Sequence, residues 1–500
     1  MKKNLKKLGK VGMYLLIFAG ALLSLSIFWM LRTWNHLNID EMLYHIRAPK
    51  TGTDSSIIMG YITGCLVPAV VVLAAAIVLT LVWKKKKMLY GYILMGISLC
   101  AAVFSVAHVW KKMDIGNYLK NASTYSSFID DNYVYPAEVD MKFPEQKRNL
   151  IYIYLESMET TFTDPRFGGA WEENLIPNLT YYALEHESFN GDNREINGAT
   201  VLNKTTYTMG GLFAESMGLP LIVPIDGNAM WCQDEFLPEL DGIGDVLEDN
   251  GYQNTFLIGS HAMFGGRNLF YRDHGNYEIY DYYHALWNGM LPTNDYKVFW
   301  GYEDDKLFEF AKDYILEDAA SGQPFNMTML TVDTHFEDGY LCEDCERLHE
   351  DNPYEDVFNC SDRKIAEFVE WVQEQDFYEN TTIVLVGDHL TMDADFCKAV
   401  DKAYDRRVYM SIINGAATPE NDVMRQYSTL DLFPTTLAAM GVEIEGDRLG
   451  LGTNLYSSKP TLLEEYGEEA INTAFDQKSV MMEHLGATID MTKEELKMYE

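Results

Sequence analysis

The chain has 500 residues and a formal net charge of −36, and its charges are divided unevenly along its length. Residues 1–112 carry 14 Lys and Arg against 3 Asp and Glu, whereas residues 113–500 carry 25 against 72. The excess of acidic residues in the second part argues against a nucleic-acid partner, because such a partner would require a basic surface. It also disfavours broad adhesion to an anionic lipid surface, and it suits solubility in an exposed compartment.

Three apolar stretches in the first part are long enough to cross a membrane. They are Val11–Leu31, Ile57–Trp83 and Leu89–Trp110, and each suffices for a hydrocarbon core of roughly 30 Å. Lysines precede the first stretch, and Lys84–Lys87 separate the second from the third. Because basic loops stay in the cytoplasm, three crossings predict that everything after Trp110 lies outside it. The first stretch is longer than a typical signal-peptide core and lacks a clear cleavage site.

The second part of the chain shows the alternation of an α/β domain. Strand-like apolar runs are followed by helix-like runs, among them Glu303–Ala320 and Ser361–Gln375. Such alternation predicts an α/β sandwich around a mostly parallel sheet. We therefore expect four parts: a membrane domain with three transmembrane helices (1–112), a juxtamembrane linker (113–148), a globular domain outside the cytoplasm (149–458) and a charged helical tail (459–500).

Two segments of the globular part place reactive side chains at the ends of predicted elements. Leu150–Leu155 is typical of a buried strand and delivers Glu156 at its carboxyl end, where an oxygen ligand for a metal would lie. In Thr205–Leu221 (TTYTMGGLFAESMGLPL), Thr208 precedes two glycines and a helix-like run. The backbone N–H groups of a helix start favour a phosphate, and a metal would activate the Thr hydroxyl as a nucleophile. An ordinary N-cap is the alternative for Thr208.

The segment TIVLVGDHLTM, residues 382–392, is the most informative one. Ile383–Val386 predicts a strand buried on both faces, and Asp388 and His389 follow it side by side. Ligands of parallel sheets gather at the carboxyl ends of strands, and a carboxylate beside an imidazole suits a divalent metal. The alternative is an Asp that caps the next helix, beside a surface His. Together the segments predict one site with three metal ligands and a metal-activated nucleophile: Glu156, Asp388, His389 and Thr208.

Seven cysteines are too few to hold so long a chain together through a disulfide framework. Three of them, Cys342, Cys345 and Cys360, cluster after the predicted strand Met327–Val332. Outside the cytoplasm a bridge between two of them is plausible, and it would leave the third thiol unpaired. A zinc site is the alternative, although no second CxxC pair has the required spacing.

Four motifs occur in order along the globular part: LIYIYLESME, TYTMGGLFAESMGLPL, LTVDTHFEDGYL and NTTIVLVGDHLTM. In these motifs, and over about Arg148 to Ser458, the chain resembles the membrane phosphoglycerol transferases of the alkaline phosphatase and sulfatase superfamily. Within this group the chain resembles the glucan phosphoglycerol transferases of bacterial envelopes more than it resembles the lipoteichoic acid synthases. The resemblance implies an alkaline phosphatase/sulfatase-like α/β/α sandwich, so that residues 149–458 would be a catalytic domain.

The resemblance also implies roles for individual residues. Thr208 matches the family's catalytic Thr and a metal ligand. Glu156, Asp388 and His389 match the other metal ligands. His335, in the VDTH motif, matches a His that contacts the transferred group, and it closes the predicted strand Met327–Val332.

His261 and Arg267 lie in the segment that binds the phosphoglycerol head in the synthases. That segment departs from the synthase pattern here, because its Trp is absent and Gly265 and Gly266 stand near its place. The His is also closer to the Arg than in the synthases. A satisfied loop His and a surface Arg are therefore the alternatives for His261 and Arg267.

By the same resemblance the cofactor is one divalent metal ion. The synthases suggest Mn²⁺, and the ligand set would also accept Mg²⁺ or Zn²⁺. The donor implied is phosphatidylglycerol, and the acceptor is a glycan, a glycolipid or polyglycerol phosphate. The membrane spans would hold the site close to that lipid donor.

Three other functions are open at this point. A phosphoethanolamine transferase of the same superfamily would use the same Thr chemistry with a different head group. A sulfatase-like hydrolase would need a Cys or Ser in a CxPxR-type context, whereas here Thr208 lies in TYTMGG. A non-catalytic membrane sensor or scaffold would have kept the fold alone, and the presence of all four core residues argues against it.

Overall fold

The computed structural model describes residues 2–34, 39, 55–82, 87–222, 235–393 and 395–489. This part of the chain divides into two compact units, of which one holds the N-terminal helices and Met392–Lys398 and the other holds the α/β domain. The predicted end of the second span at Trp83, the basic residues Lys84–Lys86 and residues 490–500 of the predicted tail lie outside the described residues.

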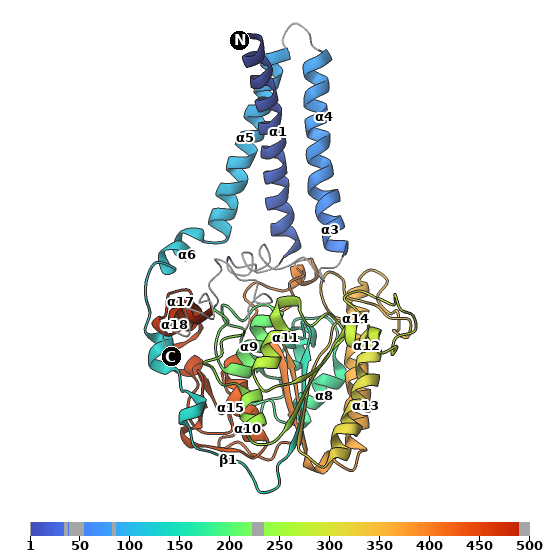
Figure 1. Cartoon of the computed structure of the whole chain (residues 1–500), viewed down its shortest axis with the longest axis vertical. Coiled ribbons are helices and arrows are strands. Elements are labelled where there is room, and N and C mark those ends of the chain that lie inside the picture. The colour runs from blue at the N-terminus through green and yellow to red at the C-terminus, as the bar shows by residue number, and fades with distance from the viewer. Residues whose placement is uncertain are drawn as a thin grey trace. The chain divides into compact units, whose positions relative to one another are not determined.

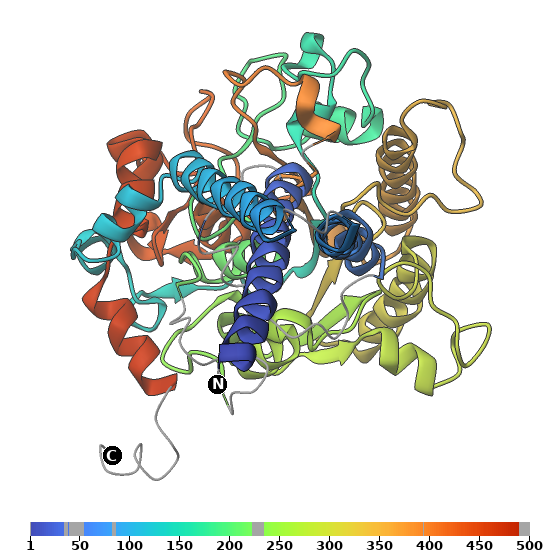
Figure 2. The ribbon, with the colours of Figure 1, turned by 90° about the horizontal axis from the view of Figure 1, so that it is seen from above.

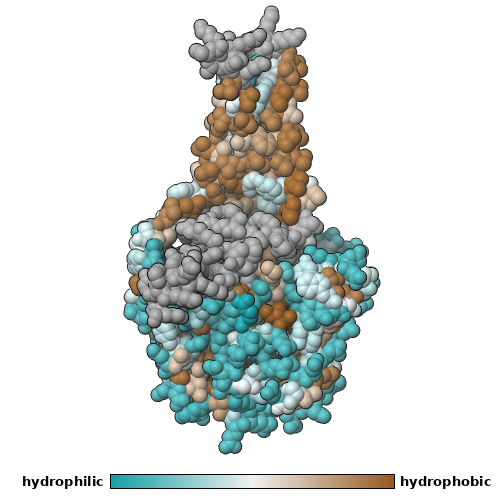
Figure 3. Space-filling model, viewed as in Figure 1, coloured by the Kyte–Doolittle hydropathy of each residue, from teal (hydrophilic) through white to brown (hydrophobic). Residues whose placement is uncertain are grey.

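The N-terminal unit is built from long apolar helices that run side by side (Figure 1). Their outward surface is hydrophobic, as expected for contact with lipid (Figure 3). The three predicted spans are confirmed as helices long and apolar enough to cross a membrane, over Leu8–Thr33, Ile57–Val82 and Met88–Lys112. The elements are α1 (Lys2–Thr33), α3 (Ser55–Tyr61), a π-helical turn η1 (Ile62–Leu66), α4 (Val67–Val82) and α5 (Lys87–Lys112).

The α/β unit is centred on a seven-stranded sheet with the order β3-β8-β7-β2-β6-β4-β5. The five strands from β7 to β5 are parallel, and β8 and β3 continue the sheet in antiparallel fashion. The strands are β2 (Asn149–Leu155), β3 (Gly198–Ala199), β4 (Gln253–Ile258), β5 (Glu278–Tyr280), β6 (Phe325–Leu330), β7 (Thr381–Gly387) and β8 (Val408–Ile413).

Helices cover both faces of this sheet, which explains why β2, β6 and β7 are buried along their whole length. On one side, α8, α13 and α14 pack together, and α13 and α14 lie next to each other in Figure 2. On the other side, α9, α10 and α15 pack together. The helices are α8 (Pro177–Glu185), α9 (Thr208–Met217), α10 (Ile243–Asp249), α11 (Arg267–Asp273), α12 (Tyr282–Trp287), α13 (Asp304–Ser321), α14 (Pro353–Gln373) and α15 (Leu432–Ala439).

The predicted fold class is confirmed: apolar N-terminal helices precede an α/β domain with a mostly parallel sheet. The helix predicted over Glu303–Ala320 is α13, shifted by one residue. The helix predicted over Ser361–Gln375 is wrong at its start, because α14 begins at Pro353. Proline at the first helical position and acidic residues in the first turn favour that start, and they were not recognised as a helix signal.

The segments on either side of the predicted globular domain are structured. The linker contains α6 (Ile115–Asn121), α7 (Phe128–Asn132) and β1 (Met141–Lys142), which pairs with β9 (Glu443–Ile444). The tail contains α16 (Leu462–Tyr466), α17 (Glu468–Phe475) and α18 (Val480–Ile489). Linker and tail meet where Ser479 Oγ donates to Asp130 at 2.8 Å. The domain boundaries after residues 112, 148 and 458 stay predictions.

Candidate active site

The carboxyl ends of two adjacent strands bring three potential metal ligands together. Strands β2 and β7 are in register up to Leu155 and Gly387, so the residues that follow them emerge at the same edge. Glu156 follows β2, while Asp388 and His389 follow β7. His389 Nε2 lies 3.4 Å from a carboxylate oxygen of each of the other two. All three side chains are buried, and their ligand atoms lie within 4.8 Å of one another.

Hydrogen bonds orient these three side chains. Asp388 Oδ1 accepts from the backbone N–H groups of Ser157 and His389 at 2.9 and 2.8 Å, and Ser157 Oγ donates to Glu156 Oε1 at 2.8 Å. His389 Nδ1 lies 2.8 Å from the Leu390 carbonyl, which can only accept, so Nδ1 carries the proton and the unprotonated Nε2 is the nitrogen that can coordinate a metal. Asp388 is therefore no helix cap and His389 no surface residue.

The charge balance of this cluster suits a divalent cation. Burial, followed by the neighbouring Glu156 carboxylate, raises the pKa of Asp388 to about 7. Within the described part of the chain, the buried Asp388 Oδ2 has no hydrogen-bond partner. A buried carboxylate oxygen without a hydrogen-bond partner, beside a second carboxylate and the unprotonated Nε2 of His389, fits a divalent cation. The residues present thus fit the predicted metal.

Thr208 of helix α9 lies next to this cluster of three side chains. It is the first residue of α9, and Tyr207 occupies the N-cap position, so the alternative of an ordinary N-cap does not hold. Its Oγ1 lies 3.3 Å from His389 Nε2. The structure thus brings together all four residues that the sequence grouped into one site.

The two glycines after Thr208 permit this approach. A Cβ atom on Gly211 would lie 2.0 Å from the Asp388 carbonyl oxygen, and one on Gly210 would lie 2.8 Å from the Lys204 carbonyl oxygen. Helix α9 therefore packs its first turn directly against the backbone that carries Asp388. The sequence showed the glycine pair but not the reason for Gly211, because Asp388 lies far away along the chain.

His335 lies beside the cluster on the turn that follows β6. Its Nδ1 donates to the Phe336 carbonyl at 2.6 Å, which leaves Nε2 open. Burial lowers the pKa of His335. The Glu156 carboxylate acts in the opposite direction and raises it, whereas nearby Arg267 lowers it further. We therefore expect a neutral imidazole at neutral pH.

A buried ionic network holds the turn of His335 in place. Asp333 and Asp304 each accept a hydrogen bond from the other's backbone N–H, and Asp304 also accepts from Val332. Lys364 of α14 lies 3.0 Å from Asp333 and 2.8 Å from Asp305. Such a network fixes the path of the backbone immediately before His335.

Arg267 is a buried side chain at the start of α11, so the alternative of a surface Arg is wrong. Its Nη2 donates to the His261 carbonyl at 3.0 Å, and its guanidinium lies 5.5 Å from the Phe264 ring centre. The His261 ring packs on Tyr283 at 4.6 Å between centres. Among the described contacts, none places the His261 ring against the metal-ligand cluster, and a loop role for His261 stays open.

Two aromatic residues of the site had no sequence signal. The Trp300 ring packs on His335 at 4.5 Å and on Phe264 at 5.7 Å between centres, and Phe299 lies 6.2 Å from His335. The Trp300 indole N–H is buried and has no hydrogen-bond partner among the described residues. Both residues come from an irregular loop, where neither periodicity nor a motif marked them.

Comparison with known proteins agrees with the predicted resemblance. The sulfatase family model matches residues 205–442. Phosphoglycerol transferase I of Escherichia fergusonii is 31% identical over 337 residues, which cover 66% of this chain and 42% of that protein. The same enzyme of Salmonella choleraesuis is 32% identical over 337 residues with the same coverage. The chain thus spans less than half the length of the curated relatives that it matches.

Among solved structures, the lipoteichoic acid synthase LtaP of Listeria monocytogenes aligns with a TM-score of 0.49 at 18% identity, over 66% of this chain and 81% of that chain. The motifs, the sulfatase match and the sequence relatives agree with one another. The chain is thus similar to the sulfatase family over residues 205–442, and to phosphoglycerol transferase I over 66% of its length.

Proposed function

We propose that this protein is a membrane phosphoglycerol transferase that moves a glycerophosphoryl group from phosphatidylglycerol to a hydroxyl acceptor. One observation carries the proposal. A Thr hydroxyl at a helix start lies 3.3 Å from an imidazole that shares a strand edge with two buried carboxylates. That constellation suits nucleophilic attack on a phosphodiester, and the relatives named phosphoglycerol transferase I suggest phosphoglycerol as the group transferred.

In the proposed reaction Thr208 Oγ attacks the phosphorus of phosphatidylglycerol. A Thr–phosphorus ester bond forms, the bond from phosphorus to the diacylglycerol oxygen breaks, and the hydroxyl proton leaves with diacylglycerol. An acceptor hydroxyl then attacks the phosphorus: the bond from the acceptor oxygen to phosphorus forms, the Thr208–phosphorus bond breaks, and the acceptor's proton passes to Thr208 Oγ. The acceptor would be a glycan, a glycolipid or polyglycerol phosphate.

Glu156, Asp388, His389 and Thr208 would hold the metal ion. When bound, a divalent cation such as Mn²⁺ lowers the pKa of a hydroxyl and polarises a phosphodiester. The hydrogen bonds from Ser157 and to Leu390 preset the carboxylates and the imidazole for this role.

The remaining site residues would handle the transferred group. Arg267 contributes positive charge toward phosphoryl oxygens. His335 presents its open Nε2 to the same group, and His261 supports Arg267 through its carbonyl. Because Arg267 is buried and held on that carbonyl, it is already ordered before substrate arrives.

The membrane helices are consistent with a donor that is itself a membrane lipid. Basic clusters before the first span and between the second and third favour a cytoplasmic position for both, which puts the α/β domain outside. A lipid donor in the outer leaflet would then be within reach of a domain tethered to that leaflet. The acidity of the domain suits this exposed location.

The test is diacylglycerol release by the full-length protein in detergent with Mn²⁺. Phosphatidylglycerol is compared with phosphatidylethanolamine as donor, and wild type with Thr208→Ala. Thr206→Ala, in the same TTYT run, is the matched control. We expect release from phosphatidylglycerol by wild type and Thr206→Ala, and none by Thr208→Ala. Release from phosphatidylethanolamine alone would replace the donor, and release by Thr208→Ala would overturn the nucleophile.

A further inference from the structure

A cluster of three cysteines lies outside the candidate active site and has no part in the proposed reaction. Cys345 and Cys360 form a disulfide, with 5.4 Å between their Cα atoms. Cys342 keeps a free thiol, and its sulfur lies 3.1 Å from that of Cys345 and 4.0 Å from that of Cys360. All three side chains are buried, and Tyr340 and Leu341 pack against them. A thiol this close to a disulfide is within reach of it for exchange.

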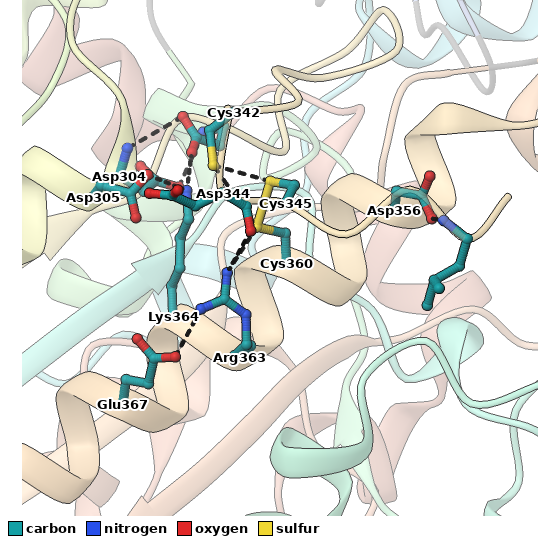
Figure 4. Close-up of a disulfide and its surroundings, with 12 residues drawn as sticks. Asp304, Asp305, Cys342, Asp344, Cys345, Asp356, Cys360, Arg363, Lys364 and Glu367 are labelled. Carbon is teal, nitrogen blue, oxygen red and sulfur yellow. Dashed lines mark hydrogen bonds and ion pairs between the residues drawn. A yellow bond between two sulfur atoms is a disulfide. The ribbon is translucent and has the colours of Figure 1, made fainter. Parts of the chain in front are cut away.

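Two basic side chains of helix α14 lie near the three cysteines, as Figure 4 shows, and each is also paired with a carboxylate: Arg363 with Glu367, and Lys364 with Asp305. Arg363 Nη2 lies 3.5 Å from Cys360 Sγ. Lys364, the next residue, favours the thiolate form of Cys342, although burial raises the pKa of that thiol overall and Asp305 adds to the rise. The guanidinium beside Cys360 would stabilise this sulfur as a leaving thiolate.

We propose that Cys342, Cys345 and Cys360 form a thiol–disulfide exchange site, with Cys342 as the attacking thiol. The Cys342 thiolate attacks Cys345 Sγ. A bond between Cys342 and Cys345 forms, the bond between Cys345 and Cys360 breaks, and Cys360 leaves as a thiolate beside Arg363. The proton lost by Cys342 is taken up by Cys360. The number of disulfides is unchanged, so the step requires no external oxidant or reductant.

Exchange changes what the disulfide connects. Cys342 and Cys345 lie in the loop of residues 336–352, whereas Cys360 lies in α14. In the pairing seen here, the loop is bonded to the helix. After exchange, the bridge lies within the loop and the helix is released.

The loop reaches the candidate active site at its other end. Tyr340 stacks on Phe299 at 6.4 Å between ring centres, and Phe299 packs beside His335. The exchange chemistry stands independently of the transferase assignment. Only an effect of the exchange on transferase turnover, through the ring contacts of Tyr340 and Phe299 beside His335, rests on the proposed function.

The experiment reads disulfide connectivity in the full-length protein, kept in detergent without reductant, quenched with acid and alkylated on its free thiols. Trypsin cleaves after Arg347 and Arg363, so Cys360 lies on the peptide Leu348–Arg363, and Cys342 and Cys345 share the peptide that ends at Arg347. In wild type we expect Leu348–Arg363 in two forms, cross-linked and alkylated. The alkylated form should be matched by an equal amount of the other peptide with an internal disulfide.

Three variants make the outcome decisive. Cys342→Ser should leave Leu348–Arg363 wholly cross-linked, and Cys397→Ser, which removes a buried thiol elsewhere, should behave as wild type. Cys360→Ser, treated with oxidised glutathione to supply the two-electron oxidation, should form the bridge between Cys342 and Cys345. The proposal is overturned if wild type is as fully cross-linked as Cys342→Ser, or if Cys360→Ser keeps two free thiols after that treatment. Three free thiols holding a zinc ion in wild type would also overturn it.

Discussion

The candidate active site has two sides that are built in different ways. The metal-ligand cluster of Glu156, Asp388 and His389 stands on the ends of two registered parallel strands, and α9 brings Thr208 to it. The side that would hold the transferred group, with His335, Arg267 and Trp300, comes from loops and from the start of α11. Regular strands fix the first side through their register, whereas the second depends on local contacts such as the network at Asp333. The first side is thus set by the sheet, and the second by contacts between loops.

The largest expected effect is on the strand-end side. Asp388→Ala removes one ligand and the hydrogen bonds that orient Ser157 and His389, so bound metal should be lost together with turnover. Even residues that only support ligands change metal affinity by about 10 to 100-fold, and a ligand should exceed that. Asp376→Ala, at an exposed position before β7, is the control. Elemental analysis of the purified variants measures the bound metal per protein. Unchanged metal content in Asp388→Ala would remove this residue from the ligand set.

Packing of α9 gives the second prediction. In Gly211→Ala the new Cβ would lie 2.0 Å from the Asp388 carbonyl oxygen, so the helix must move away and carry Thr208 with it. We expect a loss of stability of about 1–3 kcal/mol, as for other overpacked sites, and a strong loss of turnover. Gly96→Ala in α5, where a Cβ meets nothing within 4 Å, is the matched control. A thermal melt and a turnover assay check both effects. Full turnover in Gly211→Ala would contradict the close approach.

The third prediction concerns pH. The pKa of Asp388 is raised to about 7 in the metal-free site, first by burial and then by Glu156. Between about pH 4 and pH 7 the folded metal-free protein keeps this proton while the unfolded chain has lost it. The folded state therefore loses stability through this group as pH rises across that window. A cation removes the penalty, so the gain in Tm on adding Mn²⁺ should grow from pH 5.5 to pH 7.5.

Asp388→Asn is the control for this pH dependence, because the amide does not titrate. The gain in Tm on adding Mn²⁺ should then be small and flat across the same pH range. A gain that grows with pH equally in wild type and in Asp388→Asn would assign the effect to another group.

The smallest expected effect is on the side of the transferred group. Trp300→Phe keeps a ring beside His335 and removes the buried indole N–H, which has no hydrogen-bond partner among the described residues and which we expect to meet a substrate oxygen. Loss of one such hydrogen bond costs about 1 kcal/mol, or roughly five-fold in kcat/KM for the lipid donor. Metal content should not change. Trp287→Phe, at an exposed position in α12, is the control. If Trp300→Phe also loses metal, the two sides are not separate.

These two sides also differ in what the sequence could predict. The strand ending in Leu155 and the strand before Asp388 were marked by apolar runs, and the parallel topology then required their ends to meet. The glycines after Thr208 were visible, but the backbone they approach was not. Trp300 and the network of Asp304, Asp333 and Lys364 gave no signal, because their contacts join loops far apart in sequence. The sequence also left open which two of the three clustered cysteines would pair, because all three lie close together along the chain and their spacing allows more than one pairing.

The central claim is that Thr208 is the nucleophile of a metal site formed by Glu156, Asp388 and His389. Its most direct test is the intact mass of the full-length protein after incubation with Mn²⁺ and phosphatidylglycerol without acceptor, followed by peptide mapping. We predict a glycerophosphoryl adduct on Thr208 that is absent in Asp388→Ala. Diacylglycerol release that proceeds with no adduct on Thr208, and at the same rate in Thr208→Ala, would contradict the claim.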